Sequence, residues 1–286
     1  MNPDSVNESR AWPAPAKLNL FLHITGRRPD GYHNLQTVFQ LIDLCDDIHI
    51  GVRPDGRIER GAGPEGVSPE SDLVVRAARA LQEATGCRLG ADIAVTKRIP
   101  MGGGLGGGSS DAATVLLALN HLWGCELPVD DLAAIGVKLG ADVPVFVRGT
   151  SAWAEGRGEV LTPLQLPERW YVVIHPGVHV PTAALFQAPE LTRNTPVITM
   201  RGLSQTGGRN DFEPVARARY PEVAQALDWL DQQRAPARLT GSGACIFAPC
   251  VDEDEAVQIV ARVPPQWRGF AVRGLDASPV LGLLGS

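Results

Sequence analysis

The sequence lacks the features that mark membrane-embedded and secreted proteins. No run of apolar residues reaches the roughly 18 that a membrane-spanning helix requires. The first residues, MNPDSVNESRAWPAPAK, carry early acidic side chains and no long apolar segment, so we expect no secretory signal. These absences predict a cytoplasmic protein with no membrane partner.

Cysteine is scarce and forms no recognisable pattern. There are five cysteines, at positions 45, 87, 125, 245 and 250, without a CxxC pair or a histidine cluster. We therefore expect reduced, mostly buried thiols rather than disulfides. Cys245 and Cys250 flank an apolar segment and could ligate a metal, but residues in such a position more commonly pack.

Positive charge is not in excess either. The 26 Lys and Arg against 32 Asp and Glu give a formal net charge of −6, which argues against a general binder of nucleic acid or anionic membranes. Hydrophobic residues make up 44% of the 286 positions, enough for one large domain or two smaller ones. The sequence carries no signal for an oligomeric state.

Two hydrophobic periodicities alternate along the chain and predict a mixed fold. Turn residues such as Asp30-Gly31 separate the segments. Strand patterns occupy 18–24, 35–44, 46–52, 91–100, 141–149, 150–156, 169–177, 244–248 and 267–276. Helical patterns occupy 71–85, 109–123, 128–140, a short stretch near 182–190, 223–233 and 252–264, whereas 56–70 and 194–214 have the composition of loops.

Capping residues sharpen some of these boundaries. We expect Ser71 to begin one helix and Gly86 to end it, and Ser109 or Ser110 to begin the next. The pattern of predicted elements changes near residue 160. The order of elements predicts an α+β fold of two lobes, with domains at 1–160 and 161–286.

Glycine is concentrated in one segment, MGGGLGGGSSDAA at 101–113. A strand pattern precedes it and a helical pattern follows it, so a flexible linker is a poor explanation. Backbone N–H groups and a helix N-terminus at such a junction suit an anion, above all a polyphosphate.

Three phosphate-binding motifs compete for this segment. Gly102, Gly104 and Gly107 satisfy GxGxxG, but a dinucleotide site also needs a second strand ending in an acidic residue, and here another helix follows. A P-loop has the right glycine spacing from 103 to 108, yet Ser109 stands where its lysine must be.

The third candidate is the pattern P-x3-G-L-G-x2-S-S, which begins at Pro100 and resembles the central motif of the GHMP kinase superfamily. PAKLNLFL at 15–22 and TGSGACIF at 240–247 resemble its N- and C-terminal motifs. The segments 30–40, 139–146 and 175–196 are similar to one branch in particular, the kinases of a CDP-linked methylerythritol alcohol in the non-mevalonate isoprenoid pathway.

This resemblance implies a ribosomal-protein-S5-domain-2-like N-terminal lobe, a ferredoxin-like C-terminal lobe, and transfer of the γ-phosphoryl of ATP to a 2-hydroxyl. Mg²⁺ is expected from the chemistry, because polyphosphate charge must be neutralised, although no metal ligand set is readable. The implied ATP-binding residues are Lys97, Pro100, Met101, Gly102, Gly103, Gly104, Leu105, Gly106, Gly107, Gly108, Ser109 and Ser110. Lys97 is equally well explained as an exposed lysine at a strand end, and Asp111 either points away from the phosphates or faces the metal.

The resemblance also implies catalytic residues. By pattern alone, Asp142 in GADVP is an ordinary helix-end or turn aspartate, and Lys17 is a surface lysine whose stem covers apolar neighbours. The family match instead makes Asp142 the general base and places Lys17 beside it, where its charge would assist.

The predicted substrate residues are Asn19, Tyr32, His33, Thr182, Phe186, Gly241 and Ser242. Tyr32 and His33 are expected to bind cytosine, with Phe186 closing an aromatic sandwich. Gln187 stands where the family often carries lysine. Two alternatives remain: a kinase for another small alcohol, such as homoserine or mevalonate, and a nucleotide sensor without catalysis.

Overall fold

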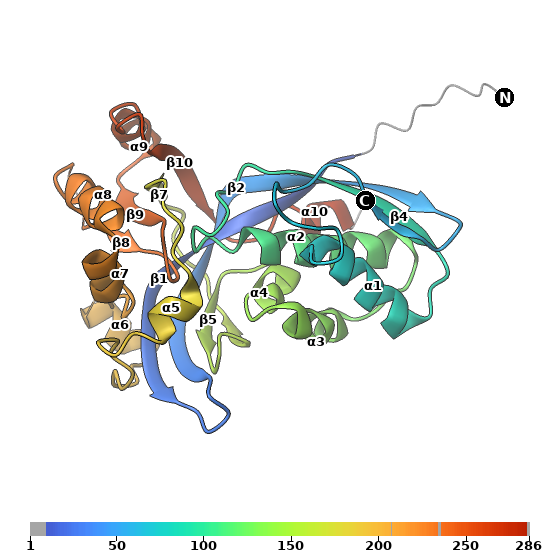
Figure 1. The fold of residues 1–286 in the computed structure, drawn as a ribbon, viewed down its shortest axis with the longest axis horizontal. Helices are drawn as coiled ribbons and strands as arrows, with labels where there is room; N and C mark the ends of the chain where they lie inside the picture. Colours follow the sequence, from blue (N-terminus) through green and yellow to red (C-terminus); the bar gives the residue numbers. More distant parts are fainter. Residues whose placement is uncertain (1–9, 207, 234–235, 285–286) are drawn as a thin grey trace.

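Two long antiparallel strands run through both halves of the molecule (Figure 1). In this computed structural model, which describes residues 10–206, 208–233 and 236–284, they are β1 (Trp12–Arg27) and β2 (His33–Arg53). Their register runs from Trp12 opposite Ile48 to Arg27 opposite His33. The two strands predicted over 35–44 and 46–52 are thus one continuous strand.

The first half is completed by short strands and four helices. β2 pairs with β4 and with β5, β3 lies parallel to β4, and β6 pairs with β5. The helices cover one face of this part of the sheet (Figure 1). The elements are β3 (Ile58–Arg60), α1 (Leu73–Thr85), β4 (Gly90–Thr96), α2 (Gly107–Leu122), α3 (Val129–Leu139), α4 (Val143–Arg148), β5 (Ala152–Glu155) and β6 (Val160–Pro163).

The second half continues the same sheet. β10 joins β2 through Gly274 opposite Ile42 and Leu275 opposite Leu41, and then pairs with β7, which pairs with β9. Helices lie along its outer side (Figure 1). The elements are β7 (Trp170–His175), α5 (Thr182–Phe186), α6 (Met200–Thr206), α7 (Glu213–Arg219), α8 (Pro221–Asp231), β8 (Arg238–Leu239), β9 (Ile246–Cys250), α9 (Glu253–Val260), β10 (Arg268–Leu275) and α10 (Leu281–Leu284).

Several predicted elements are corrected. The strand predicted over 141–149 is wrong, because α4 forms there, with Pro144 in its first turn and Gly149 in a left-handed conformation at its end. The segment 194–214, predicted as loop, contains α6 and the start of α7, and 56–70 contains β3. The strand predicted to reach residue 100 ends at Thr96.

The predicted helix starts are also wrong. Asp72, not Ser71, caps α1, since its carboxylate accepts a hydrogen bond from the backbone N–H of Val74 at 3.1 Å. α2 begins at Gly107, so neither Ser109 nor Ser110 is its N-cap, and the Ser110 hydroxyl donates to the carbonyl of Pro15. The stop at Gly86 is correct.

Separate apolar clusters support the two halves. One lies between α1–α4 and the first part of the sheet, and another between β7–β9 and α7–α9. α10 returns the end of the chain to the first cluster, through Leu281, Leu283 and Leu284. Along the described residues, no helix combines the length and apolarity needed to cross a membrane. The five cysteines are free thiols, with Cys245 and Cys250 buried and the others half-buried.

Candidate active site

Two glycine loops from opposite halves of the chain contact each other: the first is residues 101–108 and the second is residues 240–243. The backbone N–H of Ala244 donates to the carbonyl of Gly102 at 3.3 Å, and that of Cys245 donates to the carbonyl of Gly103 at 3.0 Å. The N–H of Lys17 donates to the carbonyl of Leu105 at 3.0 Å, so β1 holds the first loop as well. The segment 101–108 is therefore held in place by backbone hydrogen bonds from both halves of the chain.

Close backbone contact explains the glycine at position 104. Gly104 has φ +75°, and a Cβ built there would lie 2.2 Å from the carbonyl oxygen of Thr240. A left-handed conformation already disfavours L-residues, and this neighbour is backbone that has no rotamer with which to move away. Part of the glycine requirement thus comes from packing between the two loops.

The loops border a cavity of about 620 Å³. It brings together most of the residues predicted for ATP and catalysis, while Ser110, Tyr32 and His33 do not line it. The predicted residues that do line it are Lys17, Asn19, Lys97, Pro100, Met101, Gly102, Gly103, Gly104, Leu105, Gly106, Gly107, Gly108, Ser109, Asp142, Thr182, Phe186, Gly241 and Ser242.

Lys17 and Asp142 face each other in this cavity. The Lys17 ammonium lies 3.4 Å from an Asp142 carboxylate oxygen, with the two side chains 3% and 32% exposed. Lys17 also donates to the carbonyl of Gly104 at 2.8 Å and to the side-chain oxygen of Asn19. Asp142 precedes α4 but its side chain caps no N–H of that helix. It is therefore a partly exposed carboxylate directed at a buried cation, unlike an ordinary capping residue.

Asn19 is fixed from two sides. Its amide nitrogen donates to the hydroxyl of Thr37 at 2.9 Å, and its backbone N–H donates to the hydroxyl of Thr240 at 2.9 Å. The hydroxyls of Thr182 and Ser242, which also line the cavity, are 2.6 Å apart. Hydrogen bonds of this kind hold the cavity wall in one arrangement without using the carboxylate of Asp142.

Lys97 has two carboxylate partners, which neither sequence interpretation foresaw. Its ammonium contacts Asp111 at 2.6 Å and Asp46, and Asp46 also accepts the backbone N–H groups of Arg98 and Ile99. Burial raises the pKa of Asp111 to about 7. The ammonium of Lys97 lowers this pKa and the carboxylate of Asp46 raises it, but burial has the largest effect. Asp111 thus faces Lys97, although its other oxygen is buried without a partner among the described residues.

A second cavity, of about 680 Å³, contains the residues predicted for a base. Phe186 stacks on His33 with ring centres 4.8 Å apart and planes at 15°, whereas Tyr32 is 55% exposed. Burial, aided by the charges of Arg193 and Arg27, lowers the pKa of His33 and favours the neutral ring. Among the described side chains, the Nε2 atom of His33 is buried and has no partner.

The two cavities are neighbours, because Ala141 and Phe186 line both. Ala141 is the residue before Asp142, so the carboxylate lies next to the wall that the two cavities share. An elongated ligand with a ring at one end and a hydroxyl at the other could therefore occupy both cavities.

Two residues that shape these cavities were missed in the sequence. Asn210 donates to the carbonyls of Leu239 and Gly241, both at 2.8 Å, and so supports the second glycine loop. Arg157 lines the second cavity. The polar composition of 194–214 concealed Asn210, and only tertiary structure brings Arg157 to Tyr32.

Comparison with protein families gives two matches. Residues 72–150 match the GHMP kinases N terminal domain, and residues 189–268 match the GHMP kinases C terminal domain. The predicted resemblance and the predicted α+β fold of two lobes are confirmed.

Curated relatives extend over nearly the whole chain. The 4-diphosphocytidyl-2-C-methyl-D-erythritol kinase of Cupriavidus necator is 59% identical over 281 residues, 96% of each chain. That of Alkalilimnicola ehrlichii is 57% identical, covering 96% of this chain and 94% of its own.

Solved structures agree in shape. A crystal structure of 4-(cytidine 5'-diphospho)-2C-methyl-D-erythritol kinase is 35% identical with a TM-score of 0.81, covering 93% of this chain and 99% of that one. A mevalonate kinase, at 15% identity and a TM-score of 0.70 with 94% and 100% coverage, shares the fold alone.

Proposed function

Since the chain belongs to the GHMP kinase family, and within it to the 4-diphosphocytidyl-2-C-methyl-D-erythritol kinases, we propose that Asp142 and Lys17 carry out phosphoryl transfer from ATP to the 2-hydroxyl of that CDP-linked alcohol. The protein is an ATP-dependent kinase of isoprenoid biosynthesis. The observation that carries the residue assignment is the Lys17–Asp142 pair beside the first glycine loop.

ATP binds along the first glycine loop in this proposal. The loop precedes the 16-residue helix α2, whose first N–H groups and dipole favour phosphate. Backbone contacts to Thr240 and Cys245 hold the loop in position before any ligand arrives. Lys97 stays committed to its two carboxylates, so it stabilises the segment before the loop rather than serving as a free phosphate ligand.

The alcohol substrate occupies both cavities. Its cytosine lies in the second cavity beside Tyr32, His33 and Phe186. Its methylerythritol end passes Ala141 and reaches Asp142 in the first cavity. Homoserine and mevalonate have no base for the second cavity, which supports the CDP-linked substrate over those alternatives.

Asp142 acts as the general base. Its carboxylate is the exposed member of the pair and accepts the proton of the alcohol as the oxygen attacks the γ-phosphorus. Lys17 is buried and anchored by Gly104 and Asn19, so its charge is already oriented toward the transferring group. Catalysis here consists mainly of positioning and charge, as in other phosphoryl transfers.

Mg²⁺ would enter with ATP. Among the described residues, no group of three or more His, Cys, Asp or Glu side chains could hold a metal alone. Mg²⁺ typically uses one or two protein oxygens together with substrate phosphates, and Ser109 and Asp142 line the cavity as oxygen donors of that kind. When bound, the ion would neutralise polyphosphate charge. Ser110 is fully buried and does not line the cavity, so it does not fit this role.

We expect the enzyme to act in the cytoplasm on small molecules alone. The net charge of −6 supports the absence of nucleic-acid partners.

The test measures ADP release with ATP and Mg²⁺ for one alcohol at a time: the CDP-linked methylerythritol, free methylerythritol, homoserine and mevalonate. Turnover should occur only with the first. Asp142→Asn should lower kcat by roughly 100-fold or more and leave ATP binding within about threefold. Asp131→Asn, a change of exposed charge on α3, is the control. Unchanged turnover in Asp142→Asn would refute the general-base assignment, and ATP binding without any turnover would favour a nucleotide sensor.

A further inference from the structure

The second cavity is strongly positive. Arg27, Arg157 and Arg193 line it, and among its described lining residues there is no carboxylate. Cytosine is neutral and does not require three guanidinium groups. Positive charge in the cavity that holds the base site instead suits the negatively charged group that joins the two ends of the substrate.

Arg157 differs from the other two arginines, because it combines a ring contact with guanidinium N–H donors that have no acceptor among the described residues. Arg193 is occupied by the carbonyls of Leu191, Phe186 and Ala188, at 2.7–3.0 Å. Arg27 is exposed at the end of β1. Within the described part of the chain, the guanidinium of Arg157 makes no hydrogen bond and no ion pair, yet it lies over the Tyr32 ring, 4.3 Å from its centre.

The contact of the Arg157 guanidinium with the Tyr32 ring leaves its N–H donors available. A guanidinium that stacks on an aromatic ring uses its face, while its N–H donors point outward in the plane. Those donors match two oxygens of a phosphate, which accept them as a charge-assisted pair. Arg157 can therefore order the exposed Tyr32 ring and bind an anion at the same time.

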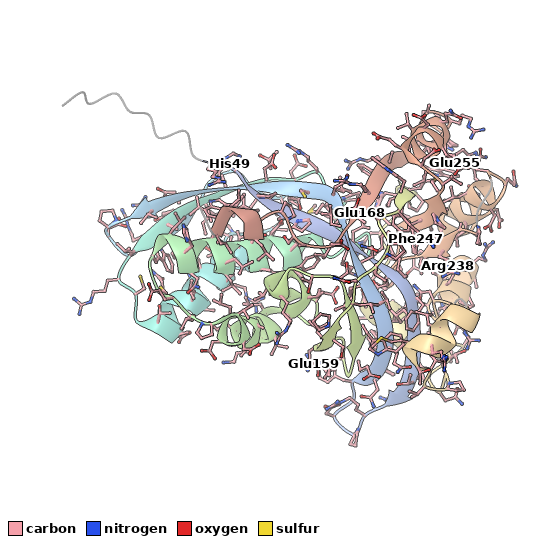
Figure 2. All side chains as sticks on the ribbon, turned by 180° about the vertical axis from the view of Figure 1, so that it is seen from behind. His49, Glu159, Glu168, Arg238, Phe247 and Glu255 are labelled. Carbon is pink, nitrogen blue, oxygen red and sulfur yellow. The ribbon has the colours of Figure 1, made fainter. Side chains whose placement is uncertain are left out.

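Its backbone is held in place by the neighbouring hairpin. Arg157 lies in the turn between β5 and β6, where its N–H donates to Glu159 and the carbonyl of Gly156 accepts from Leu35 on β2 at 2.6 Å. Figure 2, in which Glu159 is labelled, shows this turn beside the hairpin of β1 and β2. The side chain thus extends from an anchored turn.

We propose that Arg157 is a recognition residue for the diphosphate of the nucleoside diphosphate substrate, using its N–H edge for phosphate and its face for Tyr32. This inference rests on the proposed function. The diphosphate lies between the base near Tyr32 and the hydroxyl near Asp142, and the two cavities share Ala141 and Phe186 as lining residues. Arg157 lines the cavity on the base side of these two residues.

The experiment compares binding of cytidine, CMP and CDP to the intact protein by calorimetry, with turnover of the CDP-linked alcohol measured in parallel. Arg157→Gln removes the charge and keeps a long polar side chain. Arg157→Lys keeps the charge but loses the planar face. Arg262→Gln, which removes an exposed arginine charge beyond α9, is the matched control.

In Arg157→Gln, the Kd of CDP should rise about tenfold or more, and the Kd of cytidine no more than about threefold. Arg157→Lys should fall between the wild type and Arg157→Gln for CDP. KM for the alcohol should follow the CDP result, with KM for ATP unchanged. Melting temperatures close to the wild type would show that the variants are folded.

Two results would overturn the inference. Equal weakening of cytidine and CDP would mean that Arg157 only supports Tyr32, and no weakening of either would mean that it contacts neither part. A wild-type protein that binds neither nucleotide and does not turn over the CDP-linked alcohol would refute the proposed function itself, and this inference with it. The wild-type arm therefore separates the two failures.

Discussion

Replacing Gly104 by alanine tests whether the first glycine loop is shaped by its contact with the second. The new Cβ would lie 2.2 Å from the carbonyl oxygen of Thr240, at a residue with φ +75°. The left-handed conformation costs an L-residue about 1–2 kcal/mol, and overpacking against a neighbour that cannot rotate away costs about 1–3 kcal/mol. Gly104→Ala should therefore lower the free energy of unfolding by about 2–5 kcal/mol.

Gly108 supplies the matched control within the same segment. It lies in the first turn of α2, its φ is not in the left-handed region, and an added Cβ would meet only Leu73 at 3.5 Å, an ordinary contact. Alanine is a better helix former than glycine, so Gly108→Ala should leave stability unchanged or raise it by up to about 1 kcal/mol.

Thermal and urea unfolding without nucleotide measure both variants. For a chain of this size, the expected loss in Gly104→Ala corresponds to a fall in Tm of roughly 5–15 °C. If Gly104→Ala unfolded within about 0.5 kcal/mol of the wild type, the backbone contact between the two loops would not be what requires glycine there. Equal losses in both variants would contradict the structural distinction between the two positions.

Three further predictions concern single side chains. Lys17→Met should lower kcat about 100-fold or more in the ADP-release assay, with KM for ATP changed much less, because the charge facing Asp142 is lost; a kcat within threefold of the wild type would refute the role of Lys17. Tyr32→Ala should raise KM for the CDP-linked alcohol about tenfold but not KM for ATP, given the usual strength of base stacking; equal effects on both would exclude a cytosine site. The raised pKa of Asp111, about 7, means that the folded protein binds this proton more tightly than the unfolded chain, so this group's contribution to stability falls as pH rises from about 4 to 7. In urea unfolding, the free energy of unfolding of Asp111→Asn minus that of the wild type should therefore be about 1–3 kcal/mol higher at pH 8 than at pH 5. A difference that stays the same at both pH values would contradict the burial of an ionised Asp111.

Local sequence determined the glycine loop, the helix that follows it and most of the strands, because these depend on short-range periodicity and on the residues that can end an element. It also identified the GHMP kinase family from three motifs, together with Lys17, Asp142 and the aromatic residues of the second cavity as candidates. It did not determine the segment after Asp142. VPVFVRG alternates like a strand, and only its packing against α2 and α3 makes it the short helix α4.

Tertiary structure alone decided which partners these residues have. Lys97 appeared from its position to be either a nucleotide ligand or a surface lysine, but it is paired with Asp46 and Asp111, which lie 51 and 14 residues away. Arg157 is far from Tyr32 in the chain and carries no motif, so nothing local indicated that its guanidinium lies over that ring. The glycines of the first loop suggested close approach by a ligand, and Gly104 is approached by the backbone of Thr240. Contacts between distant segments depend on how the strands pair and the halves pack, and a local pattern does not carry that information.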